Sequence, residues 1–261
     1  MTAPLTNALR HDRRVVGCAL LLVAALSWAW LLAGAGMDMD AFEMTRHSTM
    51  HMPWLKPTAW TPGYALLMFC MWWVMMVAMM LPAATPVILL AAALNRRLDA
   101  RIAPYGSSIA FTVGYLLAWG GFSAIVVLLQ WWLERSGLLT PMMVSASSLF
   151  AGFVLLVAGL WQFSPWKAAC LRHCRSPVDF LTRYHRPGNA GALAMGWRHG
   201  LYCLGCCWFL MALLFVGGVM NLYWIIGLTV YVWVEKMLPG GPLTARVMGA
   251  LLVIWGLIVA V

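Results

Sequence analysis

Three cysteines and a histidine lie close together in one apolar part of the chain, the segment His199–Met211. On an α-helix, which turns by about 100° per residue, its ligand-type side chains would share one broad face. These side chains are His199, Cys203, Cys206, Cys207 and Met211. Thiolates and imidazoles are common ligands of Cu(I) and Zn(II), so the segment predicts a soft-metal site. The cysteines could equally act with the nearby glycines as small residues that let membrane helices pack closely.

A second sulfur-rich segment is a run of methionines earlier in the chain. The methionines that recur every three or four residues, and so share a helix face, are Met68, Met71, Met75 and Met79, with Met76 and Met80 beside them. Thioethers are uncharged and polarisable, so the run predicts a Cu(I) path through an apolar environment, or else flexible packing between helices. Pro82 and Pro86 follow the run. We expect them to kink the helix and free backbone carbonyls there.

Two further groups carry weaker ligand signals. Cys170, His173 and Cys174 repeat the thiol and imidazole chemistry shortly before the first segment, although such a grouping can arise by chance in a solvated loop. His47 and His51 lie among methionines and aspartates in a stretch without cysteine. An oxidising compartment permits this ligand set for copper, because thioethers and imidazoles do not form disulfides. The methionines of this stretch could instead anchor a loop at the membrane surface.

Glu235 ends an apolar stretch of the chain, next to Lys236. An acidic residue at membrane depth is a functional candidate, here as a metal ligand. Pairing with Lys236, or extension of the side chain to the lipid headgroups, would explain its presence equally well.

The composition indicates which elements must position these residues. Apolar residues make up 63% of the 261 residues and charged residues only 10%, proportions at which a soluble domain could not cover its surface. Apolar stretches of about 20 residues cross a bilayer. We expect seven spans, at Val15–Gly36, Tyr64–Leu94, Ser107–Leu133, Met142–Phe163, His199–Met220, Leu222–Val234 and Leu243–Val261. The sequence therefore predicts an all-α, multi-pass membrane protein with a single domain over residues 1–261, an outer loop at 37–63 and an inner loop at 164–198.

Lys and Arg gather on alternate sides of these spans. They precede the first span, follow the second and are frequent in residues 164–198. Short cytoplasmic loops are enriched in Lys and Arg, so we expect a cytoplasmic N-terminus and, after an odd number of spans, Val261 outside. The net charge of +9 is then mainly a topology signal, and no nucleic-acid partner is expected. The first span could be a signal peptide, but Trp28, Trp30 and its length favour a retained helix.

Two stretches of the chain resemble a known family. The first is the run from Trp72 to Pro86, and the second is Gly200-Leu-Tyr-Cys-Leu-Gly-Cys-Cys-Trp208 with its continuation through Asn221 to Lys236. They are similar to a bacterial family described as predicted metal-binding integral membrane proteins, a family of unknown function. The resemblance covers most of the chain from the first span to Gly241 and implies a metal-associated protein of the bacterial inner (cytoplasmic) membrane. It implies no reaction.

The leading functional hypothesis is a metal-handling protein whose metal is copper, with zinc as the alternative. It would transport Cu(I) or deliver it to a periplasmic or membrane copper protein. We expect that it is not an enzyme by itself. The alternative is a metal-containing or structural accessory subunit of a larger membrane enzyme complex. Thiol-disulfide exchange is disfavoured, because the expected topology places no thiols on the oxidising face. Two facing histidines for a membrane haem are also missing from the expected spans.

Overall fold

A computed structural model describes residues 3–47, 59–98, 105–238 and 240–261 of the chain. Within these ranges the protein is all-α, with no strand and one isolated β-bridge between Leu139 and Ser145. The helices are α1 (Ala3–Leu32), α2 (Ala41–His47), α3 (Pro62–Leu98), α4 (Tyr105–Arg135), α5 (Ser148–Gln162), α6 (Pro165–Arg175), α7 (Pro177–Tyr184), α8 (Gly188–Ala212), α9 (Leu214–Gly217), α10 (Leu222–Met237) and α11 (Gly241–Ala260). The all-α prediction is thus confirmed for the described residues.

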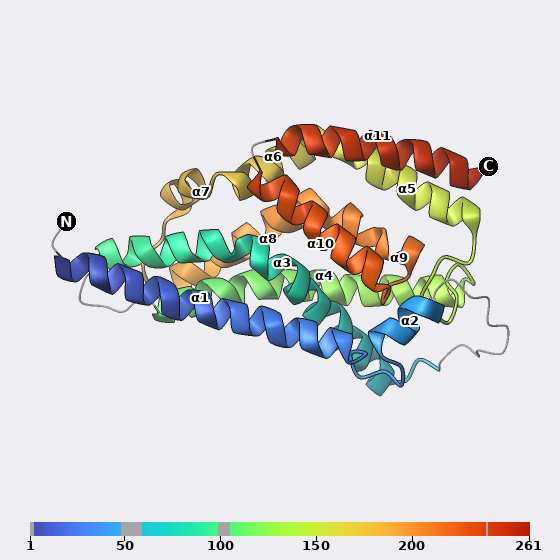
Figure 1. The fold of residues 1–261 in the computed structure, drawn as a ribbon, viewed down its shortest axis with the longest axis horizontal. Helices are drawn as coiled ribbons and strands as arrows, with labels where there is room; N and C mark the ends of the chain where they lie inside the picture. The colour runs from blue at the N-terminus through green and yellow to red at the C-terminus, as the bar shows by residue number, and fades with distance from the viewer. Residues whose placement is uncertain (1–2, 48–58, 99–104, 239) are drawn as a thin grey trace.

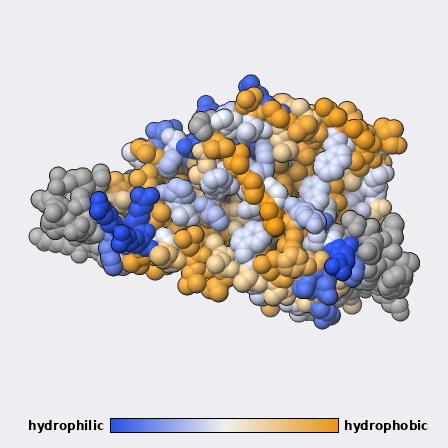
Figure 2. Space-filling model, in the orientation of Figure 1, coloured by the Kyte–Doolittle hydropathy of each residue, from blue (hydrophilic) through white to orange (hydrophobic). Residues whose placement is uncertain are grey.

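Five helices are long and apolar enough to cross a membrane, namely α1, α3, α4, α8 and α11. Helices α5 and α6 together could form a sixth span, although the chain bends by 64° between them. Helix α10, the counterpart of the expected sixth span, has only 16 residues. The prediction of seven spans therefore remains a prediction. Apolar residues occupy much of the middle of the visible face, and strongly hydrophilic residues gather mainly toward its ends (Figure 2).

The expected inner loop at residues 164–198, a connection between spans, is largely helical. Helices α6 and α7 and the first turns of α8 occupy it. Ser164 caps α6 by accepting a hydrogen bond from the backbone N–H of Trp166, and a proline follows at the start of the helix. Helix α8 begins at Gly188 and ends at Ala212, whereas the hydropathy pattern suggested His199–Met220. The first turns of α8 contain three glycines, Asn189 and Arg198, so the hydropathy pattern did not mark the start of the helix there.

The long helices pack in pairs, and α3 also packs against α4 and α10. Helix α1 lies along α3, α4 lies along α8, and α5 lies along α11. The ends of the chain lie at opposite ends of the long axis (Figure 1). Glycines permit the close approach of two of these pairs, since a Cβ at Gly196 of α8 would lie 1.9 Å from the Phe111 carbonyl oxygen of α4. In the same way, Gly152 and Gly159 of α5 meet the backbone of α11.

Helix α3 continues through Pro82 and Pro86. Pro82 has no N–H, so the carbonyl of Ala78 loses its usual partner within the helix. The indole Nε1 of Trp28 in α1 donates a hydrogen bond to this carbonyl at 3.1 Å. The freed carbonyl expected from the sequence is therefore satisfied by a neighbouring helix, which ties α1 to the middle of α3.

Candidate metal centre

Helix α8 carries its three cysteines in the interior of the protein. Cys203, Cys206 and Cys207 are all buried, and none of them forms a disulfide. The thiols of Cys206 and Cys207 donate to the carbonyl of Cys203, at 3.0 and 2.9 Å. A thiol that donates to the preceding turn can be turned toward another ligand by rotation about χ1. The three thiols thus form one compact group on a single turn of helix.

Helix α6 adds two more thiols to this group. Cys170 and Cys174 lie about one turn apart on α6, and this helix packs along α8. Cys170 lies against the neighbouring turn of α8, because a Cβ at Gly205 would be 2.8 Å from its Sγ. The structure therefore brings together the two sulfur segments that are separate in the sequence. We call Cys170, Cys174, Cys203, Cys206 and Cys207 the cysteine cluster.

One methionine of α3 reaches the cysteine cluster. The Sγ of Cys207 lies 4.0 Å from the Sδ of Met80. The other methionines of the run are buried as well, because α3 is surrounded by neighbouring helices. Met71, Met75 and Met79, like Met211 of α8, are thus placed in the core, and no direct contact with the thiols marks them as ligands. The packing role of these methionines and a role in conducting copper remain alternatives.

The closest partners of Cys203 are two residues that the sequence analysis did not place in the site. The ammonium Nζ of Lys236 donates a hydrogen bond to the Sγ of Cys203 at 2.9 Å. The hydroxyl of Tyr115, from α4, lies 3.1 Å from the same sulfur atom. Both side chains are buried. A buried ammonium group next to a thiol supplies the positive charge that a thiolate needs in an apolar environment.

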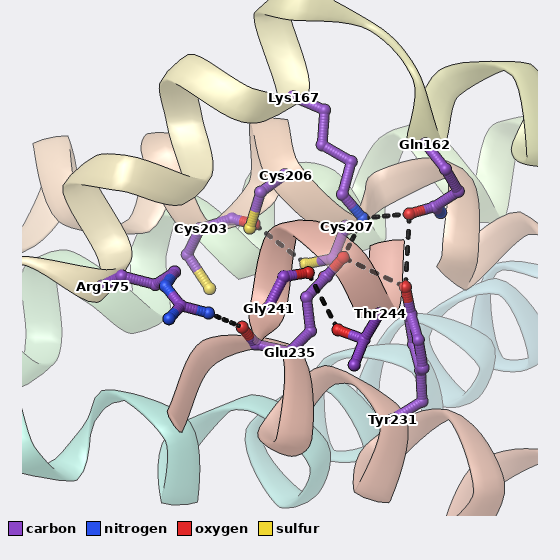
Figure 3. A network of polar contacts seen from close by, with 10 residues as sticks. All are labelled: Gln162, Lys167, Arg175, Cys203, Cys206, Cys207, Tyr231, Glu235, Gly241 and Thr244. Carbon is purple, nitrogen blue, oxygen red and sulfur yellow. Dashed lines mark hydrogen bonds and ion pairs between the residues drawn. The ribbon is translucent and has the colours of Figure 1, made fainter. Parts of the chain in front are cut away.

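Glu235 has a different partner from the one that the sequence suggested. Its carboxylate forms a buried ion pair with Lys167 of α6 at 2.6 Å, so Lys236 remains for the cysteine. Tyr231 donates a hydrogen bond to Glu235 at 3.0 Å, and Gln162 also accepts one from Lys167. Figure 3 shows these groups meeting beside the α8 cysteines. Glu235 is therefore engaged in a polar network that joins α5, α6 and α10.

His199 lies one turn before Cys203, within a cage of aromatic rings. The rings of Phe111, Tyr115 and Phe180 lie 5.1 to 6.1 Å from the imidazole, measured between ring centroids. Its Nδ1 is buried and has no hydrogen-bond partner. Buried polar atoms are nearly always paired, so an unpartnered ring nitrogen near thiols fits a donor that is held for another ligand.

Of the weaker candidates, Cys170 and Cys174 belong to the cysteine cluster, whereas the three histidines have other surroundings or lie outside the described residues. His173 stacks on Tyr202, with 4.2 Å between ring centroids, and its Nδ1 contacts the Ala169 carbonyl. His47 is the last residue of α2, a short helix in the connection between α1 and α3. His51 lies outside the described residues.

A cavity of about 1100 Å³ opens beside α6, α7 and the start of α11. Its basic lining residues are Lys167, Arg172, Arg175, Arg183 and Arg246. The guanidinium of Arg175 also donates to the Glu235 carbonyl at 2.7 Å, so the cavity wall is continuous with the polar network. Such a positively charged wall attracts anionic groups, including lipid phosphates.

The ligands of the cysteine cluster suit Cu(I), a soft monovalent ion that needs few ligands, better than Zn(II), a divalent ion that needs four. In the described part of the chain, no group of three or more His, Cys, Asp or Glu side chains is already arranged to hold a metal ion. Structural zinc sites need four such ligands in a closed shell. Cu(I) is held by few, soft ligands, so two thiols, with the Met80 thioether nearby, are chemically sufficient. The cluster can therefore accept Cu(I) after rotation of its thiols.

Comparison with known proteins gives one match. A family model, PpoB2, described as a copper chaperone, matches residues 69–259, which include the methionine run except Met68, the cysteine cluster and Lys236. No curated protein and no solved structure matches the chain. The match supports the copper-related part of the resemblance noted in the sequence and gives no support to zinc.

Proposed function

Because the chain belongs to the PpoB2 copper chaperone family, we propose that it is a membrane copper chaperone that holds Cu(I) at the cysteine cluster and passes it to a partner copper protein. The observation that carries this proposal is the group of buried thiols on one turn of α8, with the Cys170 thiol of α6 packed against the same helix and the Lys236 ammonium 2.9 Å from the Cys203 sulfur. Thiolates select Cu(I), and an apolar interior excludes water that would compete for the ion. The cluster therefore provides a protected site for a reactive cargo.

Charge balance supports the same assignment. Cu(I) bound by two thiolates carries a net charge of −1, which is costly to bury alone. Lys236, at 2.9 Å from the Cys203 sulfur, supplies one positive charge at this position. The nearby Lys167 is already neutralised by Glu235. The bound state is thus electrically neutral, which favours binding of a monovalent ion over a divalent one.

The expected orientation fits this role. We propose seven spans with a cytoplasmic N-terminus, α5 and α10 being the two short ones. In support, α5 and α10 run beside the longer helices, and the ends of the chain lie at opposite ends of the molecule (Figure 1). The arginines of α6 and α7 then face the cytoplasm, where cysteines stay reduced. The cysteine cluster would accordingly exchange copper on the reducing side of the membrane.

A transport role is a second candidate. It is favoured by one contact, the 4.0 Å separation of Cys207 Sγ and Met80 Sδ, which joins the cysteine cluster to the methionines of α3. Exchange between soft ligands would let Cu(I) move along this helix without water. Copper uptake into sealed vesicles that contain the purified protein distinguishes transport from delivery.

The decisive experiment measures Cu(I) binding by cysteine variants of the purified protein. Cys203, Cys206 and Cys207 are replaced together by serine, and copper per chain is measured after anaerobic loading and competition with a Cu(I) chelator. The matched control replaces Cys18 and Cys70, which are free cysteines outside the cluster. We expect the triple variant to lose high-affinity binding and the control to retain it. Equal binding by the triple variant would overturn the proposal.

A further inference from the structure

We propose that the protein has a second Cu(I) site, lined by methionine thioethers, at the end of the helix bundle where α2 and α9 lie. The cysteine cluster does not require this site, and the proposal therefore goes beyond the chaperone function above. Methionines from three separate parts of the chain meet there around one cavity. They are Met37, Met39, Met44, Met142, Met143 and Met220.

The cavity is unusually rich in methionine. It has a volume of about 310 Å³ and 13 lining residues, of which six are methionine, although the whole chain has only 19 methionines in 261 residues. Met44, Met143 and Met220 are buried, while Met37, Met39 and Met142 are partly exposed. The thioethers therefore extend from the protein interior to an accessible opening. Packing alone does not account for methionines at an opening, where a ligand can reach them.

Hydrogen bonds between distant segments hold the cavity together. The backbone N–H of Leu222 donates to Thr45, the residue after Met44, at 2.9 Å. The N–H of Ser145 donates to the Phe215 carbonyl at 2.8 Å, which joins the α4–α5 connection to α9. Such links preorganise the side chains that line the cavity, so binding an ion requires little rearrangement.

The backbone at Met143 points to the same conclusion. Its φ of 56° lies in the left-handed region, which is uncommon for a residue other than glycine. The N–H of Met143 donates to the Thr140 carbonyl at 2.8 Å, and its carbonyl accepts from Val219 at 3.4 Å. A conformation of this kind persists where the surroundings fix it, and it occurs often at ligand sites. Here it directs the Met143 side chain into the cavity lining.

The chemistry of the lining selects a soft cation. Thioethers bind Cu(I) and its analogue Ag(I), whereas Zn(II) and Ca(II) prefer nitrogen, thiolate or oxygen ligands. Asp38 also lines the cavity and supplies a negative charge near a bound cation. The amide of Asn221 is already occupied, because it bonds to the Gly217 carbonyl and to the N–H of Tyr223. The methionines are therefore the available ligands.

The position of the cavity relates it to the cysteine cluster. Tyr64 and Leu67 of α3 line it, and Met80 of the same helix contacts Cys207. Thirteen residues of helix separate Leu67 from Met80, a rise of roughly 20 Å. In the proposed orientation the cavity is on the outer, oxidising side of the membrane. Cysteines form disulfides there, whereas methionines do not. The second site would thus exchange Cu(I) on the oxidising side.

The first test uses the protein in which Cys203, Cys206 and Cys207 are serine, so that copper at the cysteine cluster does not interfere. Cu(I) is added anaerobically, and we expect about one ion per chain with sulfur-only scattering in its X-ray absorption spectrum. Loss of a group that only supports a metal ligand weakens metal binding roughly 10- to 100-fold. Replacing Met37, Met142 and Met220 by leucine removes ligands themselves and should weaken Cu(I) binding by more than this. The matched control replaces Met195, Met237 and Met248, which do not line the cavity.

The second test uses the unaltered protein and does not depend on the folding of a variant. Hydrogen peroxide oxidises accessible methionines to sulfoxides, which mass spectrometry detects at each position. Ag(I) should protect Met37, Met39 and Met142 but leave the oxidation of Met248 unchanged. Binding that is insensitive to the leucine substitutions, together with no protection by Ag(I), would refute the second site. If only the cysteine substitutions lower copper binding, the second site is refuted and the chaperone proposal is retained.

Discussion

Removing the ammonium group of Lys236 should severely weaken copper binding at the cysteine cluster. At 2.9 Å from the Cys203 sulfur, a unit charge contributes about 6 kcal/mol of Coulomb attraction to a thiolate at an effective dielectric constant of about 20. The desolvation of both groups offsets part of this attraction, and removal of one partner from a buried pair costs about 3–5 kcal/mol. Since about 1.4 kcal/mol corresponds to a factor of ten, the Lys236→Met variant should bind Cu(I) roughly 100- to 4000-fold more weakly.

The assay is competition between the purified variant and a Cu(I) chelator, followed over pH under anaerobic conditions. Metal binding releases the protons of its ligand thiols, so a variant that lacks the ammonium group should release more protons per copper than the unaltered protein. A merely structural role of Lys236 would not change this proton count. Lys236→Arg keeps the charge and should retain most of the affinity. Equal affinity and equal proton release in Lys236→Met would refute the assigned role of this residue.

Three further outcomes follow from the packing. Lys167→Met leaves Glu235 buried without its cation and should lower the free energy of unfolding by about 3–5 kcal/mol in detergent, whereas replacement of both residues by methionine should restore much of the loss. Gly196→Ala should prevent the close approach of α8 to α4 and lower the thermal midpoint, while Gly121→Ala, where a Cβ meets nothing within 4 Å, should leave it unchanged. Trp28→Phe removes the donor to α3 and should cost about 0.5–1.5 kcal/mol in urea unfolding, and no change would argue against this hydrogen bond.

The helical character and the membrane setting were readable from the sequence because both depend on local properties. Hydropathy over about 20 residues identifies a span without reference to its neighbours. Helical periodicity likewise placed Cys203, Cys206 and Cys207 on one face, and all three are buried. The bounds of α8 were less readable, because the helix begins three turns before the expected segment, in a glycine- and alanine-rich stretch with weak hydropathy.

The composition of the site depended on contacts between distant segments. The Cys170 thiol lies against Gly205, between the cysteines of α8, because α6 folds back against α8, and no periodicity within either segment indicates this. For Glu235 the sequence left a metal ligand, pairing with Lys236 and extension to the headgroups as alternatives, and it did not suggest Lys167. Adjacent residues on a helix point in different directions. Their side chains diverge by about 100°, so Glu235 meets Lys167 while Lys236 meets Cys203.

By itself, the sequence determined that this protein is helical, that several of its helices are apolar enough to cross a membrane, and that these helices carry soft ligands. Chemical type and helical phase belong to each residue and its near neighbours, so they can be read along the chain. Only the tertiary structure decided which ligands share a site, which cation faces the thiols and which methionines surround the outer cavity. These depend on how closely whole helices approach one another, and glycines such as Gly196 control that approach through the side-chain volume they lack.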